Sequence, residues 1–183
     1  MFTLILQIFY FFLPIGFANS APVFVKKIKY FNFLDIPCDF NKTFNNKPIL
    51  GRSKTFRGLI SATIMGITVC CLQKYLFNKG ILTNFSIIDY SRYSAIFLGF
   101  LLGFGAIFGD MVESFFKRQF NVKSGDPFLI FDQIDYILGA IAFSVFYFSL
   151  GIKNYILAII IYVVMHFLVS YLGYLTGFKD KPV

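Results

Sequence analysis

Five long apolar runs constrain the fold of this chain more than any other feature of its sequence. Each run is 17 to 21 residues long, and they cover residues 2–18, 59–77, 93–109, 134–152 and 155–175. As a helix, about 20 residues cross the ~30 Å hydrocarbon core of a bilayer. Apolar residues make up 57% of the chain and charged residues only 14%, whereas soluble domains are about a quarter charged. The sequence therefore predicts an all-α, polytopic membrane protein with one integral-membrane domain and five transmembrane helices.

The first run has two possible interpretations. Small residues follow it, as they follow the apolar core of a cleaved signal peptide, but no Lys or Arg precedes it. Signal peptides normally begin with a positively charged region. We therefore expect a retained first helix, with a kink or a break at Pro14.

Charged residues gather between two of these runs, in the stretch 109–135. If residues 110–119 are helical, five polar side chains fall at i, i+3, i+4, i+7 and i+8, which is one face of a helix. Asp132 and Asp135 are three residues apart and can point the same way. The polar side chains of the helical face are Asp110, Glu113, Ser114, Lys117 and Arg118.

This arrangement of charges is what a site for Mg²⁺ and a polyphosphate requires. Carboxylate oxygens hold the metal, the metal bridges phosphate oxygens, and the Lys–Arg pair neutralises the remaining charge. The alternative is a solvated cytoplasmic loop whose charges only anchor the flanking helices. The clustering favours the first interpretation.

The polar segment 19–58 ends in a second basic motif. Residues 50–58, LGRSKTFRG, alternate small, hydroxyl and basic residues directly before an apolar run. Glycines let the backbone approach a phosphate, and the amides of a helix N-terminus favour an anion. Lys54 and Thr55 resemble half of a P-loop, but the first Gly of that motif is missing and no strand precedes it, which excludes a Walker A motif. The positive-inside rule alone is an equally good explanation of these cations.

Counting cations predicts the orientation of the chain. Segments 19–58, 110–133 and 176–183 hold eight, three and two Lys and Arg, whereas the opposite side holds four, at Lys74, Lys79, Arg92 and Lys153. We therefore expect the cell (cytoplasmic) membrane as the location, with the N-terminus outside and the C-terminus in the cytoplasm. The net charge of +8 then reflects cytoplasmic loops and anionic lipid head groups, and no nucleic-acid partner is expected.

A few residues stay without an assigned role. An ionisable residue inside a membrane is a functional candidate, but His166 is equally consistent with a neutral side chain bonded to a neighbouring helix. The odd number of cysteines and their lack of metal-ligand spacing indicate neither a disulfide framework nor a zinc site. These cysteines are Cys38, Cys70 and Cys71. Asp89 is expected in a surface loop.

Over almost its whole length the chain resembles the CDP-archaeol synthase family of membrane cytidylyltransferases, relatives of the phosphatidate cytidylyltransferases. The most specific part of the resemblance is the Gly-Asp…Lys-Arg…Asp-Gln-x-x-Asp arrangement between Gly109 and Asp135. The other matching parts are Ala18-Asn19-Ser20-Ala21-Pro22, the segment from Gly51 to Gly58, and the ending Gly177-Phe178-Lys179-Asp180-Lys181-Pro182.

The resemblance implies a cytoplasmic charged cavity, Mg²⁺, and the reaction of CTP with a membrane lipid phosphate. That lipid is unsaturated archaetidic acid, an isoprenoid glycerol-ether phosphate, and the products are a CDP-lipid and pyrophosphate. Asp110, Asp132 and Asp135, with Glu113 as a further candidate, would hold Mg²⁺. Lys117 and Arg118 would bind the triphosphate, and Lys54 with Arg57 would bind the lipid phosphate or the triphosphate. The remaining substrate-binding candidates are Asn19 and Asp39, which would orient the nucleotide, and Thr55 and Ser114.

Three other functions fit part of the pattern. A phosphatidate cytidylyltransferase acting on diacyl lipid would use the same chemistry, although the short length and five helices favour the archaeol type. A transporter or channel would place charges within helix centres or show inverted repeats, and the sequence has neither apart from His166. A non-enzymatic membrane-surface protein would explain the basic loops but not the paired aspartates.

Overall fold

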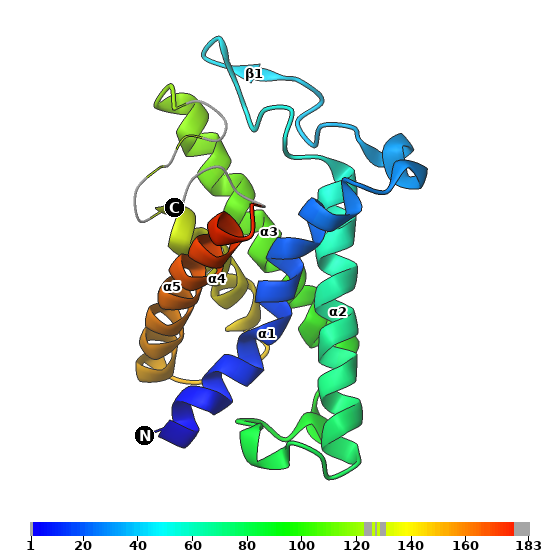
Figure 1. Cartoon of the computed structure of the whole chain (residues 1–183), viewed down its shortest axis with the longest axis vertical. Helices are drawn as coiled ribbons and strands as arrows, with labels where there is room; N and C mark the ends of the chain where they lie inside the picture. The colour runs from blue at the N-terminus through cyan, green and yellow to red at the C-terminus, as the bar shows by residue number, and fades with distance from the viewer. Residues whose placement is uncertain (1, 123–125, 127, 129–130, 178–183) are drawn as a thin grey trace.

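Long helices form most of the protein in the computed structural model, which describes residues 2–122, 126, 128 and 131–177 (Figure 1). The expected all-α class is confirmed. Short 3₁₀ helices and one two-stranded antiparallel hairpin lie in the connections between the α-helices. The α-helices are α1 (Phe2–Val25), α2 (Phe56–Asn78), α3 (Ala95–Gln119), α4 (Phe131–Ser144) and α5 (Ile152–Leu175); the short elements are η1 (Lys29–Leu34), β1 (Thr43–Phe44), β2 (Lys47–Pro48), η2 (Thr83–Phe85) and η3 (Tyr90–Arg92).

Within the described residues, four helices are long and apolar enough to cross a membrane: α1, α2, α3 and α5. They have 23 to 25 residues each, so each spans about 35 Å at 1.5 Å per residue, more than the ~30 Å hydrocarbon core. With 14 residues, α4 is only about 21 Å long. A fifth helix that crosses the membrane on its own therefore stays a prediction.

The C-terminal ends of three helices lie several residues away from the ends of the apolar runs. The structure extends α1 to Val25 and α3 to Gln119, so the first parts of the expected loops 19–58 and 110–133 are helical. The polar residues there do not end the helices, because some of them face other parts of the protein: Glu113 and Ser114 are buried. No helix fills the apolar run 134–152, since α4 ends at Ser144 and the chain turns before α5 begins. At Pro14, where a kink or a break was expected, α1 continues as one helix.

Glycines bring α3 very close to its two neighbours. An added Cβ at Gly66 of α2 would lie 2.7 Å from the Cα of Gly103 on α3. On the opposite side of α3, an added Cβ at Gly139 of α4 would lie 2.7 Å from the Cα of Gly109. Because a side chain at these positions would force the backbones apart, the glycines fix how closely α2 and α4 pack against α3.

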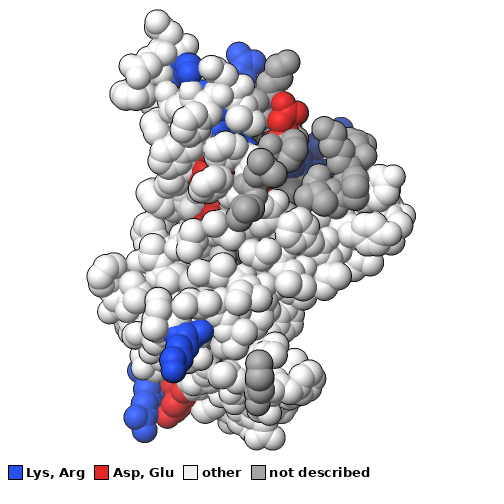
Figure 2. Space-filling model, turned by 90° about the vertical axis from the view of Figure 1, so that its left-hand side faces the viewer, with Lys and Arg blue, Asp and Glu red and all other residues white. Residues whose placement is uncertain are grey.

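On the face of the molecule drawn in Figure 2, the described charged residues gather toward the two ends. Figure 2 shows Lys, Arg, Asp and Glu near the upper and lower ends of one face, with an uncharged belt between them. Large apolar side chains such as Ile64, Ile96 and Ile160 are exposed on the long helices. A soluble protein would bury such residues, so the belt supports a membrane-embedded protein. Of the family-like ending 177–182, only Gly177 belongs to the described residues, and Lys123, Lys179 and Lys181 lie outside them.

Candidate active site

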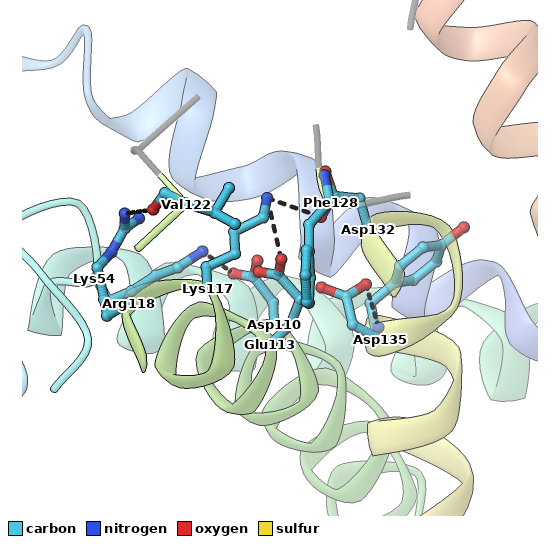
Figure 3. A network of polar contacts seen from close by, with 10 residues as sticks. Lys54, Asp110, Glu113, Lys117, Arg118, Val122, Phe128, Asp132 and Asp135 are labelled. Carbon is cyan, nitrogen blue, oxygen red and sulfur yellow. Dashed lines mark hydrogen bonds and ion pairs between the residues drawn. The ribbon is translucent and has the colours of Figure 1, made fainter. Parts of the chain in front are cut away.

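Charged side chains from three elements meet in one cavity of about 240 Å³. The second half of α3, the first two turns of α4 and the loop before α2 supply most of them, and α1 and α5 add one residue each (Figure 3). Described residues of the segments 50–58 and 109–135, which the cation count predicts on one side of the membrane, are thus brought together. The lining residues are Asn19, Ser53, Lys54, Asp110, Glu113, Ser114, Lys117, Arg118, Asp132, Asp135 and His166.

Three of these carboxylates converge closely enough to share one cation. Among the described residues, Asp110, Glu113 and Asp135 each offer an oxygen, and these oxygens all lie within 4.8 Å of one another. Asp110 and Glu113 are neighbours on one face of α3 because they are three residues apart. Asp135 reaches them from α4, because Gly109 lets the α4 backbone approach α3 at this level; an added Cβ on Gly109 would clash with the Asp135 carbonyl.

The chemistry of this donor set fits a hard divalent cation. Mg²⁺ prefers oxygen ligands and usually takes one or two carboxylates together with water and phosphate oxygens. Three carboxylates this close repel one another unless positive charge lies between them. Asp110, Glu113 and Asp135 are therefore the residues in this cavity best suited to hold a metal ion.

Two lysines provide positive charge at the edges of this group. Lys54 Nζ lies 2.6 Å from Asp110 Oδ2. Lys117 Nζ bridges Glu113 Oε1 at 3.0 Å and Asp132 Oδ1 at 2.7 Å. Both ammonium groups are largely removed from bulk solvent, because the Lys54 side chain is 18% exposed and the Lys117 side chain 11%. An anionic ligand entering the cavity therefore meets partly desolvated cations, which attract it more strongly than surface lysines would.

Asp132 plays a different part from the other predicted metal ligands. It is absent from the convergent group, and its carboxylate accepts the Phe128 N–H at 3.1 Å in addition to the Lys117 ion pair. The close group therefore contains Glu113, the further candidate from the sequence, and not Asp132, whose role as a metal ligand stays a prediction. Arg118 also lines the cavity, and its guanidinium donates to the Val122 carbonyl at 2.6 Å.

Asp39 lies outside the cavity and organises the loop that leads to it. Its carboxylate accepts three backbone N–H groups, from Asn41 at 2.9 Å, Leu50 at 2.8 Å and Gly51 at 3.0 Å. Burial acts to raise the pKa of this carboxyl, but the hydrogen bonds outweigh burial and hold the pKa below its ordinary value. Gly51 has a φ of +85°, and an added Cβ there would lie 3.3 Å from Arg118 Nε. Asp39 therefore shapes the loop that packs beside Arg118 and carries Lys54.

Arg57 and Thr55 have structural partners in the described part of the chain. The buried Arg57 guanidinium donates to Asn32 Oδ1 at 3.1 Å and Asp35 Oδ1 at 2.9 Å. Thr55 is the N-cap of α2, where its hydroxyl accepts the Gly58 N–H at 3.3 Å. Arg57 thus fastens η1 to the first turn of α2.

A second cavity of about 240 Å³ adjoins the first and has a different lining. The two share Asn19, Ser53, Lys54 and Asp110. The rest of the second cavity is mostly apolar, with one polar end at the shared residues. Its other lining residues are Pro22, Val23, Cys38, Thr55, Gly58, Leu59, Ile107 and Met111.

Three cavity residues with a hydroxyl, imidazole or thiol group had no defined role in the sequence. Ser53 lines both cavities, and its position inside the basic motif 50–58 is a signal that pointed to it. His166 lines the charged cavity, and being the only histidine within an apolar run was its signal. Cys38 lines the second cavity, and no pattern in the sequence indicated this.

Comparisons with known proteins agree with this fold. The family model described as "CarS-like: CDP-archaeol synthase" matches residues 1–183. The chain is 34% identical over 187 residues to the CDP-archaeol synthase of Archaeoglobus fulgidus, covering 100% of this chain and 99% of the relative. It is 31% identical over 179 residues to that of Thermococcus onnurineus, covering 97% and 96%. A solved structure described as an intramembrane enzyme for archaeal membrane lipids biosynthesis has a TM-score of 0.70 at 23% identity, covers 88% of this chain and 91% of its own, and shares the fold.

Proposed function

The chain belongs to the CarS-like family of CDP-archaeol synthases, and we propose that its charged cavity is where CMP is transferred from CTP to a membrane lipid phosphate. As a member of this family the protein is a CTP-dependent cytidylyltransferase of phospholipid biosynthesis that forms CDP-archaeol. The observation that carries the placement of the site is the convergence of Asp110, Glu113 and Asp135 within 4.8 Å, with Lys54 and Lys117 beside them.

In this proposal the cavity lowers an electrostatic barrier. The lipid phosphate and the triphosphate of CTP are both anions. Bringing them together therefore costs an electrostatic energy that grows with the product of their charges. Asp110, Glu113 and Asp135 would hold Mg²⁺, which when bound neutralises phosphate charge and orients phosphate oxygens. Lys117 and Arg118 would bind the triphosphate and the departing pyrophosphate, and Asp132 would keep Lys117 in place.

The second cavity is suited to the lipid substrate. Its apolar side, with Val23, Leu59 and Met111, would contact the lipid chains next to the head group. Lys54 and Asn19 lie at its boundary with the charged cavity. They would contact the lipid phosphate, which meets the nucleotide without leaving the bilayer.

The chemical step needs no catalytic base. An oxygen of the lipid phosphate attacks the α-phosphorus of CTP, and the bond from that phosphorus to the bridging oxygen of the β-phosphate breaks. The bonding electrons leave with pyrophosphate. Because a phosphate is already ionised at pH 7, no proton has to be removed, and the side chains contribute by positioning groups and stabilising charge.

The assay combines purified protein with labelled CTP, Mg²⁺ and the isoprenoid-ether lipid phosphate. Wild-type protein is expected to form CDP-lipid, and Asp110→Asn or Asp135→Asn should lower the rate by at least about 100-fold, because the metal loses a charged ligand. Asp132→Asn should lower the rate through the position of Lys117. Asp89→Asn is the matched control, since Asp89 pairs with Arg92 in an exposed loop and should leave the rate unchanged.

Size-exclusion profiles and thermal unfolding must show that each variant remains folded. Full turnover in both Asp110→Asn and Asp135→Asn would rule out the metal assignment. A parallel assay with a diacyl phosphate tests the choice of lipid, and the isoprenoid-ether phosphate is expected to be the better substrate.

A further inference from the structure

A short aromatic and basic segment projects from the end of the molecule that carries the charged cavity. It comprises residues 26–36, contains η1, and follows the last turn of α1. Tyr30 is 82% exposed and Phe33 is 67% exposed, and Lys26 and Lys29 are exposed beside them. In Figure 1 this is the blue segment that extends sideways next to the start of α2. Neither cavity is lined by any of its residues.

The position of this segment places it where the bilayer core gives way to the head groups. With 24 residues, α1 is about 36 Å long and exceeds the ~30 Å core, which leaves about one turn for the head-group region. The polar residues that follow Val25 favour the last turn for this position. Arg57 in the first turn of α2 bonds to Asn32 and Asp35 and so holds η1 at the level where α2 begins. The end of α1 and the start of α2 thus both hold the segment at the same level of the molecule.

Its charge is complementary to anionic lipid. Asp35 is the only acidic residue in 26–36, and its carboxylate is paired with Arg57 at 2.9 Å. Asp35 is therefore not a partner of Lys26 or Lys29. Aromatic rings and lysines of this kind gather at the membrane interface, where the rings lie at head-group level and the ammonium groups meet lipid phosphates.

We propose that residues 26–36 form an interfacial anchor that lies in the head-group layer and binds anionic lipid. Tyr30 and Phe33 insert at the boundary of the acyl chains, and Lys26 and Lys29 contact anionic head groups. The Arg57 contacts connect the anchor to α2. The lipid contacts of the anchor therefore help to set the depth of α2 in the bilayer, and with it the position of Lys54, which lies just before α2. The anchor does not depend on the reaction assigned to the cavity.

The chain contains no Trp, so a single introduced Trp reports only on its own surroundings. Phe33→Trp in the anchor is compared with Phe44→Trp in β1, which is also exposed and lies on the hairpin at the outer end of the molecule (Figure 1). Both variants are reconstituted as full chains in bilayers that contain brominated lipid. Quenching by shallow bromines reports contact with lipid, and quenching by iodide reports contact with water.

Phe33→Trp should emit at shorter wavelength, be quenched by the brominated lipid and be shielded from iodide, whereas Phe44→Trp should show the opposite pattern. Brominated phosphatidylserine should quench Phe33→Trp more than brominated phosphatidylcholine at the same mole fraction. In the Phe33→Trp background, Lys26→Gln with Lys29→Gln should reduce this preference about fivefold per lysine. Lys42→Gln with Lys79→Gln, which removes two exposed lysines elsewhere, should leave it unchanged.

Three outcomes would overturn the proposal. The first is equal iodide quenching of the two Trp variants, which would place the segment in water. The second is equal quenching of Phe33→Trp by the two brominated lipids, which would remove the anionic preference. The third is an equal loss of that preference in both Lys-to-Gln pairs, which would make it a property of net charge.

Discussion

Lys117 is the residue on which the charge balance of the cavity depends most. It is the shared cation of Glu113 and Asp132, and the Glu113 side chain is only 6% exposed. Removing one partner of a buried ion pair leaves the other charge uncompensated and is strongly destabilising. The lysine therefore supports the folded state as well as the proposed binding of triphosphate.

Lys117→Met should lower the free energy of unfolding by about 3–5 kcal/mol. Mg²⁺ should raise the unfolding temperature of the wild-type protein, because it binds the folded state. It should raise that of Lys117→Met by more, because the cation then also replaces the missing ammonium charge. Thermal unfolding with and without Mg²⁺ measures both effects, and Lys79→Met, at the exposed end of α2, is the control. An identical Mg²⁺ response in all three proteins would contradict the prediction.

The sequence indicates which charged residues line the cavity, but not which of them contact one another. Spacing placed Asp110 and Glu113 on one helical face, and the structure agrees. Whether Glu113 or Asp132 joins the metal group depends on how α4 is rotated against α3, and spacing along one helix does not contain that angle. For Asp39, the sequence did not indicate that both carboxylate oxygens accept loop amides, and its expected role in orienting the nucleotide stays a prediction. Backbone partners of this kind depend on loop geometry that no motif records.

At the level of elements, the packing of α3 against α4 determines the geometry of the carboxylate group. Gly109 directly precedes Asp110, and Gly139 lies one turn after Asp135. Each glycine leaves no room for a side chain, because an added Cβ at Gly139 would clash with the Gly105 carbonyl and one at Gly109 with the Asp135 carbonyl. A change at either position therefore moves both helices that carry the proposed metal ligands.

Gly139→Ala should destabilise the protein by about 1–3 kcal/mol through overpacking and should weaken Mg²⁺ binding, because Asp135 moves away from Asp110. Thermal unfolding and a Mg²⁺ titration measure the two effects. Gly16→Ala serves as control, since an added Cβ there would lie 3.8 Å from the Tyr162 ring, an ordinary contact. Equal stability and equal Mg²⁺ affinity of Gly139→Ala and Gly16→Ala would show that the close approach is not required.

Hydropathy predicted where the helices are but not where they end. The apolar run of α3 stops at Gly109, yet the helix continues for ten residues because Glu113 and Ser114 are buried in the protein and do not face solvent. The run that contains α4 is apolar to residue 152, yet the helix ends at Ser144. Beyond it the chain reverses direction, and the Tyr155 hydroxyl bonds to backbone groups of Phe148 and Leu150. Such turn contacts leave hydropathy unchanged, so the pattern could not show them.

At the scale of the whole molecule, the charged cavity and the basic segments next to it lie at the same end. The hairpin of β1 and β2, the anchor and the charged cavity lie at one end of the molecule. Lys79, Asp89 and Arg92 belong to connections at the other end (Figures 1 and 2). CTP and pyrophosphate are soluble anions of the cytoplasm, so we expect the cavity to open to that side. The cation count of the sequence predicts the same orientation.

This orientation predicts which residues an impermeant reagent reaches. In a parent with Cys38→Ser, Cys70→Ala and Cys71→Ala, a membrane-impermeant maleimide should label Lys79→Cys in intact cells and Lys42→Cys only in inverted membrane vesicles. Both introduced cysteines replace exposed lysines, so access to the reagent and not burial decides the result. The parent must still form CDP-lipid, which shows that the fold is retained. The reverse labelling pattern would place the cavity outside the cell and away from CTP. Labelling of both positions from the same side would mean that α2 does not cross the bilayer.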